Sequence, residues 1–306
     1  MSATTTPAVP PSVGRRWPDD PVDLRDHTEE IVWAATRAPS YRNTQPWSFR
    51  VTARQVEVYA DRTRSCRVAD PDGRQLFLGL GAALFGVRLA LSRLRLRAVV
   101  GLSRDHAHPD LAAVVVAAGR LQAPDEEDRL YDQLGRRRTV WTPFAEDMLP
   151  LPMELEVELA DRVRHEGASA RWLRADARQA IADLTRRIAV DRRADALLVL
   201  ETADWPTATP SLEPPPALLA ICTPNDHRAD WLRAGQALHH ALLAASTVGL
   251  ASSFLGQVLE VPLLRTRLRA DLDLPGCPQV VLGLGRPRQP LPPPTPRRLL
   301  LDVLRP

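Results

Sequence analysis

The sequence contains no lysine, so all 40 of its basic residues are arginine. A Walker A phosphate loop, a protein-kinase nucleotide site and a pyridoxal phosphate Schiff base each depend on a lysine side chain, so these chemistries are excluded. A lysine nucleophile is excluded for the same reason. Any phosphate group that binds this chain must therefore be held by guanidinium groups and backbone amides.

Cysteines and long apolar runs are also scarce. Cys66, Cys222 and Cys277 fit neither a CxxC nor a zinc spacing, and an odd number argues against a disulfide framework. No uninterrupted apolar run approaches the roughly 18 residues of a membrane span, and the N-terminus lacks the pattern of a secretory signal. These absences predict a cytoplasmic protein without a membrane partner.

The charge pattern and the histidines exclude further classes. Forty basic and 37 acidic residues leave a net charge of +3, and the two signs are interleaved, so no nucleic-acid partner is indicated. No GxSxG or HExxH pattern occurs, and His106 and His108 have no acidic or cysteine partner at ligand spacing. His239 and His240 are adjacent, so they point to different helix faces. We therefore expect neither a metal site nor a catalytic triad.

Periodicity and turn residues predict an α+β chain. We expect helices at residues 28–37, 73–92 (capped by Asp72), 126–135, 153–164, 176–191 and 261–270, with another from Asp226 or Asp230 to about 248. We expect strands at residues 47–51, 55–60, 96–102, 111–121, 196–201, 217–223, 250–255 and 279–284. Residues 286–296 are proline-rich and predict an extended segment.

The order of these elements resembles an internal duplication. Each half has a short arginine-bearing polar segment, then a long helix with an apolar stripe, then a strand. We expect a disordered tail at residues 1–22, a first half at 23–122, and a second half at 123–306 with an extended C-terminal tail. Two unequal halves packed about a pseudo-twofold axis would resemble a dimer fused into one chain.

The segment APSYRNTQPW, residues 38–47, is a candidate binding loop. Pro39 ends the preceding helix, and Ser40, Asn43 and Gln45 can then direct hydroxyl and amide groups at a planar polar ligand. The same residues are also common in an ordinary helix-to-strand turn. Both interpretations stay open on the residues alone.

Two arginine groups are candidate phosphate ligands. Arg137 and Arg138 precede Thr139, and Arg297 and Arg298 follow a stiff proline run. Guanidinium groups bind phosphate with planar, bidentate hydrogen bonds. The alternatives are a solvated charge cluster at a helix C-terminus and a flexible basic tail.

Longer stretches of the chain resemble a known family. RAPSYRNTQPWSF resembles the flavin-contacting segment of nitroreductases, and the chain from about residue 28 onward resembles the Acg-type branch of that superfamily, found in actinobacteria. The matching stretches include DPDGRQLFLGLGAAL at 70–84, GRRRTVWTPF at 135–144 and LGLGRPRQPLPPPTPRRL at 282–299. A further match spans 230–269, whereas residues 190–216 match poorly.

The resemblance implies an α+β nitroreductase-like fold, an internally duplicated pseudo-dimer with antiparallel sheets covered by helices, and one FMN site per chain. The first half would contribute Ser40, Arg42, Asn43 and Gln45, and the second Arg137, Arg138 and Thr139. Arg297 and Arg298 would reach the phosphate, and backbone amides near Leu255 and Gly256 would face the flavin ring. Two departures from the family pattern stand out: Trp141-Thr142 replace two basic residues, and Arg42 stands where a histidine is common.

The function implied is an FMN-dependent oxidoreductase with a ping-pong mechanism, passing hydride from NAD(P)H to a small electron-poor acceptor. The alternative is an FMN storage or sequestering protein in which a lid excludes nicotinamide. A third possibility, prompted by Trp141-Thr142, is a degenerate domain with another ligand or partner. The pseudo-dimer could be monomeric or associate further as a homodimer, and no catalytic side chain is assigned.

Overall fold

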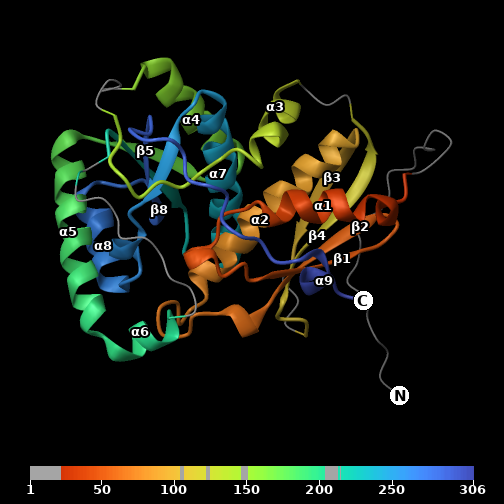
Figure 1. Cartoon of the computed structure of the whole chain (residues 1–306), viewed down its shortest axis with the longest axis horizontal. Helices are drawn as coiled ribbons and strands as arrows, with labels where there is room; N and C mark the ends of the chain where they lie inside the picture. The colour runs from red at the N-terminus through yellow and green to blue at the C-terminus, as the bar shows by residue number, and fades with distance from the viewer. Residues whose placement is uncertain (1–21, 104–106, 122–124, 146–150, 204–212, 214) are drawn as a thin grey trace.

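The computed structural model describes residues 22–103, 107–121, 125–145, 151–203, 213 and 215–306. In this part of the chain two four-stranded antiparallel sheets lie on either side of two long helices, α2 and α7 (Figure 1). The predicted disordered tail falls almost wholly on residues 1–21, outside the described residues. The predicted α+β class with two halves is confirmed.

The first half forms one sheet. It contains α1 (Thr28–Thr36), β1 (Trp47–Val51), β2 (Gln55–Ala60), α2 (Arg74–Arg93), β3 (Leu96–Leu102) and β4 (Leu111–Arg120). The strand order is β1-β2-β4-β3, and each neighbouring pair is antiparallel. Every helix and strand predicted in this half is present. The N-terminal cap of α2 differs from the prediction: Asp70, not Asp72, accepts hydrogen bonds from the backbone N–H groups of Gln75 and Leu76.

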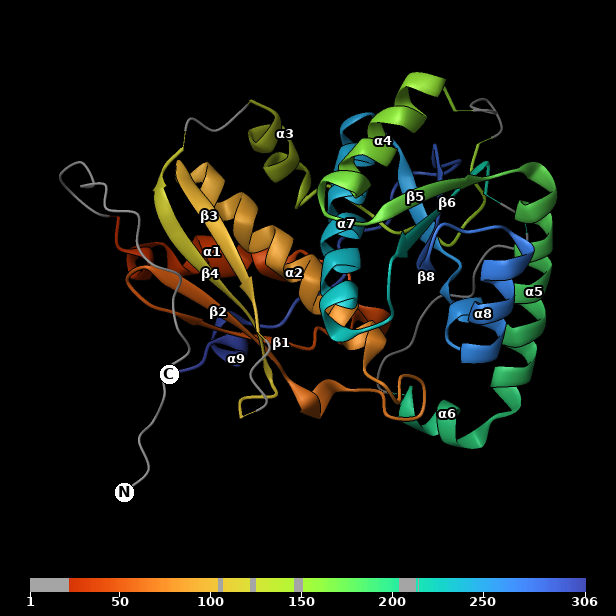
Figure 2. The ribbon, with the colours of Figure 1, turned by 180° about the vertical axis from the view of Figure 1, so that it is seen from behind.

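The second half repeats this plan with insertions. It contains α3 (Asp125–Gln133), α4 (Met153–His165), β5 (Ser169–Leu173), α5 (Ala175–Ala194), α6 (Ala196–Glu201), β6 (Ala217–Thr223), α7 (Arg228–Thr247), β7 (Ala251–Phe254), α8 (Pro262–Asp271), β8 (Cys277–Gly285) and α9 (Leu300–Val303). The strand order β5-β6-β8-β7 matches that of the first sheet. Figure 2 shows α5 and α8 on the outer side of the second sheet.

Two sequence predictions fail in the second half. Residues 196–201 form helix α6 rather than a strand, because the Asp195 side chain caps them by accepting from the N–H groups of Leu197 and Leu198 at 3.1 Å. A six-residue apolar run carries too little period to separate the two states. Strand β5 was not predicted, since its half-exposed sequence SARWL does not alternate.

The two halves meet where α2 and α7 cross. A Cβ atom on Gly81 of α2 would lie 2.1 Å from the Leu232 carbonyl oxygen, and one on Gly235 of α7 would lie 2.1 Å from that of Leu78. Counted from Arg74 and Arg228, each glycine is the eighth residue of its helix. The reciprocal contact supports two duplicated halves related by a pseudo-twofold axis.

Helix α2 is the core helix of the molecule. In the described part of the chain it is the one helix whose length and composition could span a bilayer, and 89% of its most apolar window is buried inside the protein. Its apolar residues pack against α1, α7 and the first sheet. Burial on all sides explains a composition that is apolar around most of the helix.

Candidate functional site

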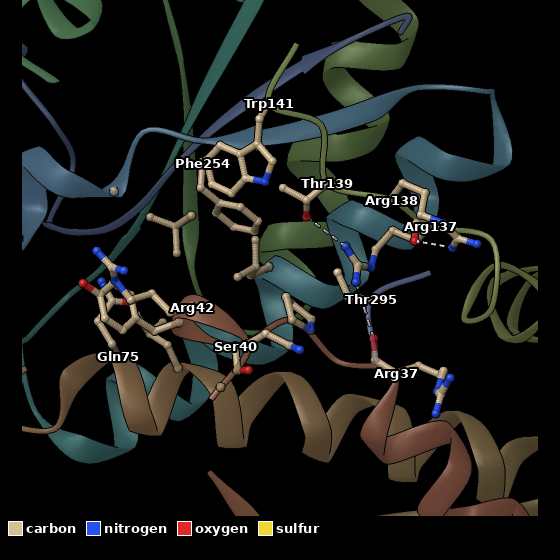
Figure 3. Close-up of a pocket in the computed structure, with 18 of the residues that line it drawn as sticks. Arg37, Ser40, Arg42, Gln75, Arg137, Arg138, Thr139, Trp141, Phe254 and Thr295 are labelled. Carbon is tan, nitrogen blue, oxygen red and sulfur yellow. Dashed lines mark hydrogen bonds between the residues drawn. The ribbon is translucent and has the colours of Figure 1, made fainter. Parts of the chain in front are cut away.

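A cavity of about 770 Å³ lies between the two halves (Figure 3). Helices α2 and α7, the loop after α1, the segment after α3, the residues after β7 and the proline-rich segment 292–295 all line it. Its volume is within the range of roughly 300–1,000 Å³ that small-molecule sites occupy. Of the eleven predicted site residues, the cavity lining includes Ser40, Arg42, Asn43, Arg137, Arg138, Thr139, Gly256 and Arg297.

The loop after α1 holds an unusual backbone conformation. Arg42, Asn43 and Gln45 have φ angles of 46°, 58° and 51°, in the left-handed region that non-glycine residues rarely adopt. The Gln45 backbone N–H donates to Ser40 Oγ at 3.0 Å and helps to hold this shape. Such strain is concentrated at functional sites, where surrounding contacts enforce it.

The C-terminal segment fastens this loop from the far end of the sequence. Asn43 Nδ2 donates to the Pro296 carbonyl at 3.1 Å, and Arg297 donates to Asn43 Oδ1 at 3.0 Å and to the Thr36 carbonyl at 2.7 Å. Arg138 Nε donates to the Pro292 carbonyl at 3.0 Å. The proline-rich segment therefore connects the first-half loop with the second-half arginines across one end of the cavity.

Four arginines gather at this end: Arg37, Arg137, Arg138 and Arg297, which we call the arginine cluster. Burial and, to a smaller extent, the neighbouring Arg138 lower the pKa of Arg137 to about 10. Burial and the other three cluster members lower the pKa of Arg297 to about 9. None of the four forms an ion pair with a carboxylate among the described residues, so the cluster is uncompensated positive charge.

Two buried donors of the cluster are unused. Arg37 Nε and Arg137 Nε have no hydrogen-bond partner within the described part of the chain. Beside them, the His239 ring adds no positive charge, because burial and Arg137 lower its pKa to about 3. Its Nδ1 lies 2.7 Å from the Ala82 carbonyl oxygen. Buried donors without acceptors are costly unless a ligand supplies the acceptor. The donor set fits a bound anion such as a phosphate.

Three predicted residues have structural contacts instead of lining the cavity. Gln45 is buried, and its Oε1 accepts from the Arg298 backbone N–H at 2.9 Å. The Arg298 guanidinium pairs with Asp61 at 3.0 Å and donates to the Trp47 carbonyl, so it braces β1 rather than reaching the cluster. Leu255 packs in the second-half core, and its N–H donates to the Val281 carbonyl, so this amide is not available to a ligand.

Sequence reasoning missed several lining residues. Arg37 is the C-cap of α1, directly before the strained loop. This position places its side chain in the cavity lining, where it joins the cluster. An arginine directly before the candidate loop was a signal that could have found it. Phe254 and Thr295 carried no such signal, since their place depends on how β7 and the proline-rich segment fold.

Trp141 and helix α6 form other walls of the cavity. Trp141, which was singled out as a departure from the family pattern, contributes an indole ring where a cation was expected (Figure 3). Leu198, Val199 and Thr202 of α6 line the side of the cavity. The Glu201 carboxylate accepts from the backbone N–H groups of Val68 and Ala69 at 2.7 and 2.9 Å, which fastens α6 to the first half.

Comparison with known proteins identifies relatives over the full length of the chain. "Putative NAD(P)H nitroreductase Rv3131" of Mycobacterium tuberculosis is 29% identical over 99% of this chain and 97% of its own length. "Putative NAD(P)H nitroreductase acg" of the same species is 26% identical over 93% of this chain and 97% of its own. No family model matches the chain.

A solved structure shares the fold. The crystal structure titled a putative nitroreductase from Anabaena variabilis has a TM-score of 0.58 and 12% sequence identity, and the match covers 82% of each chain. This likeness confirms the predicted α+β nitroreductase-like fold, with its two antiparallel sheets and duplicated halves. The full-length relatives and the shared fold confirm the predicted resemblance to nitroreductases.

Proposed function

We propose that this protein is an FMN-dependent NAD(P)H oxidoreductase that reduces a small electron-poor acceptor. The observation that carries the proposal is the arginine cluster, an uncompensated cationic site at one end of a cavity with an otherwise largely neutral lining. The names of the full-length relatives, which include NAD(P)H nitroreductase, support the same activity.

The residues present fit FMN at both ends. Arg37, Arg137 and Arg297 would hold the phosphate through charge-assisted hydrogen bonds. Gly79 of α2 and Ser40 line the cavity side by side and would lie beside the ring. The backbone of Gly256 lines the cavity and can offer an amide donor.

FMN, when bound, would supply a two-electron carrier between the nicotinamide and the acceptor. The net reaction is acceptor + NAD(P)H + H⁺ → reduced acceptor + NAD(P)⁺, and a nitro group reduced in this way yields a nitroso group and water. The protein would bind and orient the reactants, and the additional proton would come from solvent. Ser40, Thr139 and the apolar side chains of Leu78 and Leu238 would position the ring and limit its contact with water.

The proposal can be tested by purifying the protein and reducing its flavin with NADPH. The protein should be yellow or become yellow with added FMN, and NADPH should bleach the flavin absorbance without oxygen. Addition of a nitroaromatic or a quinone should restore the colour. A protein that takes up no FMN would reject the proposal.

One observation favours flavin storage as a second candidate function. Helix α6 lines the cavity and is fastened to the first half through Glu201, so it could act as a lid that keeps a nicotinamide ring from a bound flavin. A storage protein should retain FMN but show no bleaching with either NADH or NADPH. Dithionite should still bleach it, which separates an inaccessible flavin from an unreactive one.

A further inference from the structure

An exposed tryptophan lies beside the arginine cluster. Trp33 on α1 is 39% exposed, whereas the other apolar side chains of this helix are buried. Gly135, which lines the cavity, lies against the indole, since a Cβ on this glycine would be 3.9 Å from Trp33 Cζ2. The indole therefore offers an aromatic surface that adjoins the cavity wall and is open to solvent.

Arg37 connects this ring with the cluster. It follows Trp33 by one helical turn and lines the cavity, and its guanidinium carbon lies 5.4 Å from the centre of the Trp33 ring. Figure 3 shows the Arg37 side chain directed away from Arg137. Arg137 is buried, whereas Arg37 is partly exposed. The cluster therefore has an inner position at Arg137 and an outer position at Arg37, next to an aromatic ring.

The Arg37 guanidinium has an unused donor. Its Nε is buried and has no hydrogen-bond acceptor in the part of the chain that the structure describes. Carboxylates on α1 and α3 have other donors: Glu30 accepts from the Tyr131 hydroxyl at 3.3 Å, and Asp128 pairs with Arg93 at 3.1 Å. A ligand with an acidic group beside Arg37 would supply the missing acceptor.

An aromatic ring next to a cationic cluster favours a nucleotide. Bases stack on aromatic side chains through their flat faces, and guanidinium groups bind the phosphates to which a nucleoside is attached. Trp33 adjoins the end of the cavity that would hold the phosphate of a flavin. A base on Trp33 would therefore be joined to the flavin through that phosphate, which is the connectivity of flavin adenine dinucleotide (FAD).

We propose that this protein binds FAD more tightly than FMN, with the first phosphate at Arg137 and Arg297, the second at Arg37, and the adenine stacked on Trp33. The inference rests on the proposed flavin site and specifies its cofactor further. Each flavin carries about two negative charges at neutral pH. FAD spreads them over two phosphates, as the cluster spreads its guanidinium groups over an inner and an outer position.

The first test compares the two flavins on the same protein. The full chain, freed of any bound flavin, is titrated with FMN and with FAD by isothermal calorimetry, which measures binding without turnover. We expect the Kd for FAD to be about tenfold lower, since the stacking of one base on an aromatic side chain supplies about that factor or more. Equal Kd values, or weaker binding of FAD, would overturn the proposal.

Variants assign the difference to Trp33 and Arg37. Trp33→Leu should raise the Kd for FAD about tenfold and leave that for FMN unchanged, and the unchanged value shows that the variant is folded. Trp33→Phe should retain part of the preference, because it keeps an aromatic face. Arg37→Gln should weaken FAD more than FMN, whereas Arg136→Gln removes an exposed charge nearby and should leave the ratio of the two Kd values unchanged. Equal losses for both flavins in Trp33→Leu would reject the adenine contact.

Steady-state kinetics separates this inference from the proposed function. If Trp33→Leu raises KM for NADPH and changes neither flavin Kd, the ring serves the adenine of NADPH and the FAD assignment fails. If FAD binds more tightly than FMN but NADPH reduces neither flavin, the oxidoreductase proposal fails and the adenine site stands. If NADPH reduces bound FMN but FAD binds no more tightly, the oxidoreductase proposal stands and the adenine site is rejected.

Discussion

The two halves share one strand order and one helix crossing, but they differ in the connection between the first helix and the first strand. Ten residues, 37–46, join α1 to β1, whereas three residues, 166–168, join α4 to β5. The longer connection is the strained loop that lines the cavity. The longer connection in the first half therefore supplies a wall of the cavity that the short α4–β5 connection cannot supply in the second half.

The helix ends differ in charge as well as in length. Arg37 is the C-cap of α1, and Glu166 is the C-cap of α4. Glu166 is buried and contacts Arg88 and His240 Nδ1, whereas Arg37 belongs to a cluster that forms no ion pair with a carboxylate in the part of the chain that the structure describes. At the same topological position the second half carries its own internal anion, whereas in the described residues no carboxylate pairs with the first-half arginine.

A third difference lies on the long helices. Gly79 is the sixth residue of α2 and faces Ser40, and the sixth residue of α7 is Arg233, which lies against Gly167 and pairs with Asp230 at 3.2 Å. The equivalent helix position therefore carries a long side chain in the second half and none in the first. The two halves therefore share a framework and differ in the side chains at equivalent positions.

The largest loss of stability is expected at the crossing of α2 and α7, where the two halves are alike. Gly81→Ala should destabilise the protein by about 4 kcal/mol, because the added Cβ would overlap the Leu232 carbonyl oxygen and force α2 and α7 apart. Urea unfolding measures the change. Gly101→Ala is the control, since its Cβ would meet only the Val114 carbonyl oxygen at 3.8 Å, and a similar loss in both variants would contradict the proposed role of the crossing.

Removal of the buried Glu166 carboxylate should lower the free energy of unfolding somewhat less than Gly81→Ala does. Glu166→Ala should lower the free energy of unfolding by about 3 kcal/mol, because it leaves Arg88 and His240 without their carboxylate. Glu158→Ala on the same helix is exposed and should change it by less than about 1 kcal/mol.

The pH dependence of this effect has a defined sign. Burial opposes ionisation of Glu166, but His240 and Arg88 outweigh it and hold its pKa below the ordinary value of 4.5. A depressed carboxylate pKa stabilises the fold above pH 4.5, and the contribution is lost as the pH falls through the lowered value. The gap between wild type and Glu166→Ala should therefore narrow below pH 4.5, and a gap that widens there would refute this account.

Loss of one arginine of the arginine cluster should weaken ligand binding rather than destabilise the fold. Arg137→Ala should weaken FMN binding by about 1.5–3 kcal/mol, because one charge-assisted contact to the phosphate is removed. Fluorescence quenching on titration with FMN gives the Kd. Arg136→Ala, an exposed neighbour in the same triplet, is the matched control, and equal losses in both variants would argue against a specific phosphate contact.

The smallest loss of stability is expected in helix α6, which has no counterpart in the first half. Asp195→Ala should destabilise α6 by about 1 kcal/mol, because its carboxylate caps the N-terminus of this short helix. Amide hydrogen exchange at Leu197 and Leu198 should quicken while the core of α7 keeps its protection. Faster exchange throughout α7 would show that α6 is not an independent unit.

The differences between the halves also explain what the sequence could reveal. Long periodic segments such as α2 and α7 were predictable, because their apolar stripes follow the helical period. The short helix α6 and the edge strand β5 were not, because caps and sheet neighbours decide such segments. Within the site, side chains on the loop were predictable from their types, but Arg298 and Gln45 bind each other's segments, a pairing that depends on the path of the distant tail.

The proline-rich segment has a consequence for biosynthesis. Pro292 and Arg297 complete one end of a cavity whose opposite wall begins with α2, more than 200 residues earlier in the chain. A nascent polypeptide that already contains both sheets would still have an open cationic end. If the cavity binds an anion as proposed, its capture would have to wait until this last stretch has left the ribosome, because segments far apart in the sequence complete the site.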